Sequence, residues 1–193
     1  MDYNRYFISL EDRFLDIARY IDINEKNIKT FSSEIAINYM AASSEFEVVL
    51  KELCKLICPD KNYRWAKMSS MLDIVTSEYP SFISETVFLS RYKIEVTPFA
   101  TWFTKDIPIW WKSNGELKHN RSVYYEEANL ENLIDSISAL QIVNHYLVWK
   151  SLCPRQSRNA PALHMDQHPK LFRLKNVNYD GPYSSADVFD IID

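Results

Sequence analysis

The scarcity of glycine is the feature that most limits how this chain can fold. Only Gly115 and Gly181 occur in 193 residues. Phosphate-binding loops and dinucleotide-binding turns need several closely spaced glycines, because their backbone must approach the ligand closely. Tight β-hairpin turns also favour glycine. We therefore expect neither of those two loops, and we expect a fold built mainly of helices.

Length and composition fit one globular domain with its own core. Hydrophobic residues make up 47% of the chain and charged residues 25%, which is ordinary for such a domain. We find no apolar leader near the N-terminus and no apolar run long enough to cross a membrane. The three cysteines include Cys54 and Cys58, four residues apart, a spacing that suits buried thiols better than disulfides. We therefore expect a cytoplasmic protein with no membrane contact.

The acidic charge balance restricts contact with nucleic acid. The formal net charge is −4. Proteins that cover long stretches of nucleic acid are normally basic, because they neutralise many phosphates. Any RNA contact must therefore be confined to a local basic cleft.

Hydrophobic spacing predicts five helices and one extended segment. Apolar residues recur at helical intervals over residues 4–22, 33–57, 66–78, 108–120 and about 125–150. Ser32 or Ser33 can cap the second helix, and Pro59 ends it. Residues 86–97 alternate instead, which predicts a short β segment that ends at Pro98.

Periodicity ends near Cys153. Residues 154–193 contain prolines and scattered hydrophobic residues without a helical or strand pattern. We therefore predict an all-α domain over residues 1–153, a bundle of four or five helices. Residues 154–193 are predicted to form an irregular C-terminal tail that packs on the bundle or on a partner.

The most distinctive block runs from Trp110 to Arg121 and reads WWKSNGELKHNR. The sequence Ala-Asn-Leu-Glu-Asn follows at residues 128–132 and begins a long apolar helix. This combination resembles a group of bacterial HEPN-like proteins, and residues 31–51 resemble the long second helix of that group. The resemblance covers about residues 5–150, and its motifs are moderately specific.

The resemblance implies an all-α bundle that is often a homodimer and needs neither metal nor cofactor. Enzymes of this group are typically ribonucleases in which an arginine precedes a histidine by four to six residues. A histidine with a near-neutral pKa can move protons at the ribose, and a fixed cation stabilises charge on the phosphate. The resemblance also implies that the protein cleaves RNA or binds RNA or a nucleotide, in a setting of bacterial stress or phage defence.

The resemblance assigns these catalytic and binding roles to particular residues of the block. His119 would transfer the proton, and cations would stabilise the phosphate charge. Asn114 would orient a phosphate oxygen or the imidazole ring, and Trp111 would contact the substrate. The cations of this set are Lys112, Lys118 and Arg121.

The sequence departs from the family pattern at one point, and this departure supports a second functional hypothesis. No arginine precedes His119 at the expected spacing, and a lysine supplies charge without the bidentate fork of arginine. A literal match occurs at Arg158 and His164, which are therefore candidate substrate-binding residues, although Pro161 interrupts the helix that normally carries the motif. The alternative to a ribonuclease is therefore a non-catalytic interaction module that binds an effector or a nucleotidyltransferase.

Simpler roles compete with these functional ones. Lysine, histidine and arginine also suit the solvated C-terminal end of any helix. The Trp110–Trp111 pair favours core packing over base stacking, and we expect His145 to be a buried, hydrogen-bonded core histidine. His164 and His168 have the spacing of a metal-binding pair, but the neighbouring prolines disfavour a helix there, so we predict no metal site.

Overall fold

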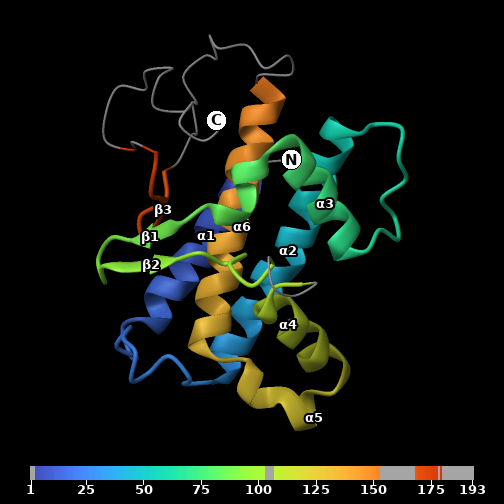
Figure 1. The fold of residues 1–193 in the computed structure, drawn as a ribbon. Coiled ribbons are helices and arrows are strands. Elements are labelled where there is room, and N and C mark those ends of the chain that lie inside the picture. Colours follow the sequence, from blue (N-terminus) through green and yellow to red (C-terminus); the bar gives the residue numbers. More distant parts are fainter. Residues whose placement is uncertain (1–2, 103–106, 153–167, 178, 180–193) are drawn as a thin grey trace.

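The computed structural model describes residues 3–102, 107–152, 168–177 and 179. Helices dominate it (Figure 1). The α-helices are α1 (Tyr3–Ile17), α2 (Ser33–Ile57), α3 (Met68–Glu78), α4 (Ile109–His119), α5 (Arg121–Tyr124) and α6 (Leu130–Leu152). The 3-10 helices are η1 (Pro80–Ser84) and η2 (Tyr125–Glu127), and the strands are β1 (Val87–Leu89), β2 (Ile94–Val96) and β3 (Phe172–Leu174).

Helices α2 and α6 pack against each other through the middle of the molecule (Figure 1). Helix α6 is buried on almost every side, as expected for a helix that is apolar all round. Tyr39, Phe46 and Leu53 of α2 are completely buried. Helices α1, α3 and α4 surround this central pair, which confirms the predicted mainly helical bundle.

Local sequence signals set the ends of α2 as predicted. The Ser32 hydroxyl accepts a hydrogen bond of 3.2 Å from the backbone N–H of Ile35, which satisfies one of the free donors of the first turn. The helix ends at Ile57, two residues before Pro59. A serine cap and a proline stop are therefore sufficient to predict this element.

The extended segment is a hairpin, and a third strand that was not predicted completes it. Strands β1 and β2 pair antiparallel, with Val87 opposite Val96. Strand β3 pairs antiparallel with the other edge of β1, with Val87 opposite Leu174, so the sheet order is β2-β1-β3. The prediction of an irregular tail is therefore wrong for residues 172–174.

A buried carboxylate holds this late strand. Glu11 of α1 is fully buried, and its oxygens accept hydrogen bonds of 2.8 to 2.9 Å from the backbone N–H groups of Lys170, Leu171 and Phe172. The Phe172 ring meets Phe14 edge to face, with 5.0 Å between centroids. Residues distant in sequence therefore fix β3, which is why local periodicity does not reveal it.

Two helix ends differ from the prediction. Helix α1 ends at Ile17 and not at residue 22, and turns follow it. Helix α6 begins at Leu130 and not near residue 125, because η2 occupies residues 125–127. Within the described part of the chain, no helix has both the length and the apolar character needed to cross a bilayer.

Candidate functional site

Helix α4 carries the distinctive block, and Trp110 anchors it to the core. Trp110 is 1% exposed, and its indole Nε1 donates a hydrogen bond of 2.9 Å to the carbonyl of Pro98. The Trp110 carbonyl accepts a hydrogen bond from the Tyr39 hydroxyl of α2. The Trp110 ring also meets Phe46 edge to face at 5.1 Å. These contacts fix which face of α4 points inward.

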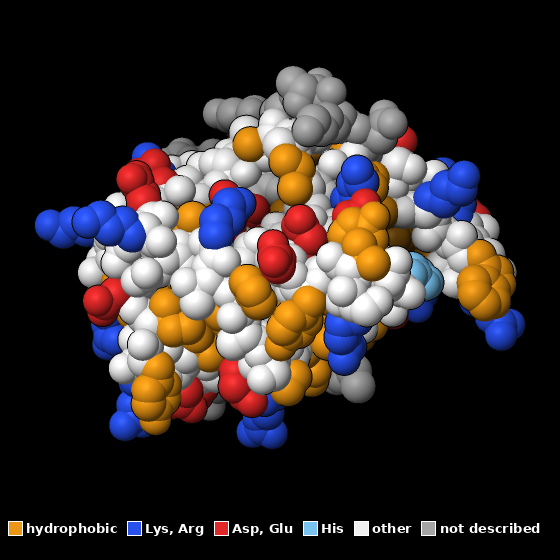
Figure 2. Space-filling model, turned by 90° about the horizontal axis from the view of Figure 1, so that it is seen from below, with side chains coloured by type: hydrophobic (Ala, Val, Ile, Leu, Met, Phe, Trp, Pro, Cys, Tyr) orange, Lys and Arg blue, Asp and Glu red, His pale blue; other side chains and the backbone are white. Residues whose placement is uncertain are grey.

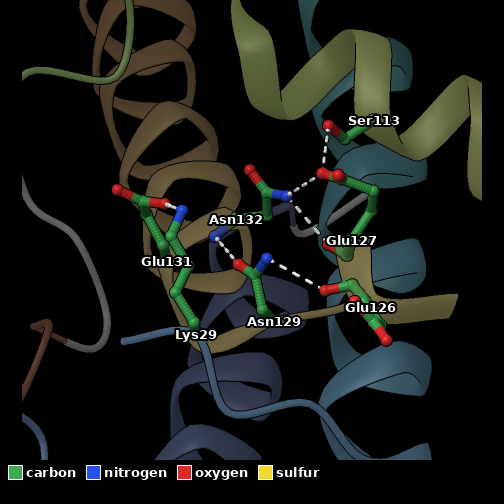
Figure 3. Close-up of polar contacts among 7 residues, drawn as sticks. All are labelled: Lys29, Ser113, Glu126, Glu127, Asn129, Glu131 and Asn132. Atoms are coloured by element: carbon green, nitrogen blue, oxygen red, sulfur yellow. Dashed lines mark hydrogen bonds and ion pairs between the residues drawn. The ribbon is translucent and has the colours of Figure 1, made fainter. Parts of the chain in front are cut away.

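A polar network fixes α4 relative to the start of α6 (Figure 3). The Ser113 hydroxyl donates a hydrogen bond of 2.8 Å to the Glu127 carboxylate. The Asn132 side-chain amide donates to both the carbonyl and the carboxylate of Glu127, at 2.8 and 3.3 Å. Asn129 closes the turn through its bond to the Glu126 carbonyl at 3.0 Å. The network holds α4, η2 and α6 in one arrangement.

The other face of α4 borders a surface hollow of about 410 Å³ between α4 and α5. These two helices lie at the lower end of the molecule in Figure 1, and Figure 2 shows that end, where hydrophobic side chains lie in patches between acidic and basic ones. The hollow is lined by Ile107, Trp111, Lys112, Gly115, Glu116, His119, Asn120 and Tyr124.

Gly115 leaves the middle of this hollow open. It lies one helical turn from both Trp111 and His119, on the same side of α4. A Cβ placed on Gly115 would meet no heavy atom within 4 Å. The missing side chain therefore leaves free space, and a larger residue would fill the hollow without displacing the protein.

Three of the residues predicted for the site meet in the hollow. Lys112, His119 and Trp111 all line it. The Lys112 ammonium lies 3.8 Å from a carboxylate oxygen of Glu116, which lines the hollow too. Trp111 is half-buried, and its ring lies 5.8 Å from that of Trp110 and 6.1 Å from that of Phe46. This tryptophan therefore both packs on the core and borders the hollow.

The other predicted residues lie elsewhere. Lys118 and Arg121 are exposed and do not line the hollow, and an Arg121 guanidinium nitrogen lies 3.5 Å from the Met40 sulfur of α2. Asn114 is 2% exposed and lies outside the hollow lining, so it is not placed to orient a phosphate there. Arg158 and His164 lie outside the described residues.

Among the described residues, the hollow does not contain the fixed charge arrangement that a ribonuclease needs. In the part of the chain that the structure describes, His119 has no hydrogen-bond partner to orient its ring. Glu116 also lines the hollow, and its carboxylate lies 3.8 Å from the ammonium of Lys112, the one predicted cation in the lining. What the hollow offers is apolar walls from Trp111 and Tyr124 with cations around them.

Two groups outside the hollow, Asp135 and His145, have strongly shifted pKa values. Burial raises the pKa of Asp135 to about 7; the nearby Glu131 adds to this, and Lys29 opposes it. Burial lowers the pKa of His145 to about 4. His145 is buried as expected, but within the described residues both of its ring nitrogens lack the expected hydrogen-bond partners.

The cysteines and histidines form no metal site within the described ranges. Cys54 and Cys58 are free thiols, and burial raises the pKa of Cys54 to about 12. A thiol with so high a pKa is mostly protonated at neutral pH and is a poor ligand and nucleophile. No group of three or more His, Cys, Asp or Glu residues with metal-binding geometry occurs among the described residues.

Sequence reasoning missed several residues of the hollow: Ile107, Gly115, Glu116, Asn120 and Tyr124. The signal for Gly115 was present, because positions 111, 115 and 119 repeat at one helical turn and share a face. Tyr124 gave no such signal, because the predicted helices end at residue 120 and begin again near residue 125, and the short helix α5 between them was not predicted.

The comparisons with known proteins assign no family. The chain matches no family model, no curated protein and no solved structure.

Proposed function

We propose that this protein is a non-catalytic, HEPN-type interaction module that binds a partner protein through the hollow between α4 and α5. The observation that supports this most is the dispersal of the predicted catalytic set. Lys112 and His119 line the hollow, but Arg121 contacts Met40 and Asn114 is buried. A proton-transfer enzyme needs its acid, base and cation held together.

The composition of this surface suits a protein ligand. Tryptophan, tyrosine and arginine are enriched in the residues that dominate protein interfaces. Trp111 and Tyr124 line the hollow, and the apolar side chains of Ile109 and Val123, near it in the chain, are 47% and 64% exposed. An apolar side chain of a partner can fill such a hollow and leave its polar neighbours at the rim.

Charge further defines the partner. Lys118, His119 and Arg121 have no acidic partner within the described residues, although the whole chain is acidic. Carboxylates on the partner would complement them, and such complementarity raises association rates and selects against other partners. The ligand we propose is therefore a segment that combines a large apolar side chain with aspartate or glutamate.

Gly115 allows a clean test of this function. Gly115→Glu fills the hollow with a charged side chain, and Gly115→Ala is the matched control, since both remove a flexible glycine from the helix. Proteins retained from a host lysate by the wild type should be purified and their affinities measured by calorimetry. We expect Gly115→Glu to weaken a direct partner at least tenfold and Gly115→Ala to leave the affinity unchanged. Equal affinity for both variants would contradict docking in the hollow.

Ribonuclease activity remains the second candidate, because one observation favours it. His119 and Lys112 line the same hollow, so one proton-transfer group and one cation could both reach a bound phosphate. RNA cleavage that is lost in a His119 variant would support the ribonuclease, whereas the interaction module predicts no cleavage.

A further inference from the structure

The hollow between α4 and α5 has a definite chemical preference. Trp111 and Tyr124 give it aromatic walls. Glu116, the carboxylate among its described lining residues, already lies 3.8 Å from Lys112. The remaining cations around it are exposed and have no carboxylate partner among the described residues. A ligand that fits must bring apolar side chains and negative charge together.

The same chain contains a segment with this chemistry. Residues 187–193 read Asp-Val-Phe-Asp-Ile-Ile-Asp, so each aspartate is separated from the next by two apolar residues. No lysine or arginine occurs after Lys175. The segment is therefore both strongly acidic and strongly apolar, which is the complement of the hollow.

We propose that residues 187–193 dock in the hollow of their own molecule and compete there with the partner. This inference rests on the proposed docking function and names its regulation. Phe189 would enter the space beside Gly115, between the aromatic walls. Asp187, Asp190 and Asp193 would face the exposed cations Lys118 and Arg121.

The chain beyond Tyr179 gives the segment a long reach. Tyr179 is held by hydrogen bonds to Gln141 of α6 at 3.4 Å and to the backbone N–H of Leu174 at 3.2 Å. Leu130, at the start of α6 and close to α5 in the chain, lies about 17 Å from Gln141 along the helix axis at 1.5 Å per residue. Phe189 is ten positions after Tyr179, and ten residues span up to about 33 Å when extended.

Attachment to the same molecule gives the segment an advantage over a free ligand. A tethered segment acts at an effective concentration of about 1 mM, so even a weak contact is largely formed. A partner must displace it, and the apparent affinity of the partner falls accordingly. The tail would then act as an internal competitor that only a tight partner overcomes.

The test uses the full chain and a fluorescein-labelled synthetic peptide of residues 184–193 as the probe. Three proteins are titrated: the wild type, a tail variant (Phe189→Ala with Ile192→Ala), and the tail variant with Gly115→Glu. Tyr183→Ala is the control for aromatic truncation outside the segment. Fluorescence anisotropy gives the affinity of the peptide for each protein.

We expect the peptide to bind the tail variant at least tenfold more tightly than it binds the wild type or Tyr183→Ala. Adding Gly115→Glu should abolish that binding. Equal affinity for the wild type and the tail variant would overturn the internal contact, yet it would leave the hollow as a docking surface.

Two further outcomes also overturn the inference. If Gly115→Glu left the peptide affinity unchanged, the segment would bind outside the hollow. The proposed function would still be tested separately by the affinity of the partner protein for Gly115→Glu. Sedimentation could also show that the wild type is a dimer and the tail variant a monomer. In that case the segment would dock on a second copy of the chain and not on its own molecule.

Discussion

The Ser113 hydroxyl of α4 lies 2.8 Å from the Glu127 carboxylate of η2 and donates a hydrogen bond to it (Figure 3). This bond joins the helix that borders the hollow to the turn that precedes α6. The position of the α4–α5 surface therefore depends on a contact that faces the core and not on the exposed cations of the surface.

Removing this contact should destabilise the fold. Ser113 is buried, so Ser113→Ala removes a hydrogen bond to a carboxylate and should lower the free energy of unfolding by about 1–3 kcal/mol. Urea denaturation measures the change. Ser122→Ala is the control, because that exposed hydroxyl bonds only the Asn120 side chain and its loss should stay within about 0.5 kcal/mol. Equal effects of the two variants would show that the Ser113 bond does not hold α4.

The late strand should depend on Glu11. Glu11→Gln keeps the size of the side chain but places an amide donor against backbone N–H groups, so we expect a loss of about 2–3 kcal/mol. Hydrogen exchange should show the earliest loss of protection at Leu171 and Phe172. Asp12→Asn is the control, since Asp12 forms an exposed ion pair with Lys170 and should matter little. Unchanged protection of Phe172 would contradict the proposed hold on β3.

These two contacts show how much of the structure the sequence could predict. The ends of α2 follow from Ser32 and Pro59, which act within one turn of the residues they affect. Strand β3 could not be predicted from its own residues, because its partners Glu11 and Val87 lie far away in the sequence. The spacing of Trp111, Gly115 and His119 predicts one face of the hollow, but the Tyr124 wall depends on the short helix α5, which has no local sequence signal.

Replacing His145 should stabilise the protein. His145 is 2% exposed and both of its ring nitrogens lack partners, so His145→Leu removes a desolvated polar group at similar volume. We expect the free energy of unfolding at pH 7 to rise by about 1–3 kcal/mol. His119→Leu, at an exposed position, is the control and should change little. A clear loss of stability in His145→Leu would mean that the imidazole makes an interaction the protein requires.

The pH dependence of stability should contain two opposing contributions. The pKa of Asp135 is raised from 3.8 to about 7 on folding, so the folded state binds more protons between these values and stability falls as pH rises through them. The pKa of His145 is lowered from 6.5 to about 4, so the unfolded state binds more protons there and stability rises with pH.

Single variants should separate these contributions. Between pH 4 and pH 6.5, the stability of Asp135→Asn relative to the wild type should increase as pH rises, because the variant lacks the falling contribution. The relative stability of His145→Leu should decrease over the same window. Urea denaturation at several pH values measures both differences, in which the other carboxylates cancel. Parallel curves for a variant and the wild type would show that the pKa of the replaced group does not shift on folding.

The most direct test of the central claim is cleavage of a mixed pool of structured and single-stranded RNAs in EDTA by the wild type and His119→Ala. A non-catalytic module predicts no difference between the two proteins at high concentration, because the hollow holds Glu116 and leaves Arg121 and Asn114 elsewhere. Cleavage by the wild type that His119→Ala loses would contradict the module and establish a metal-independent ribonuclease.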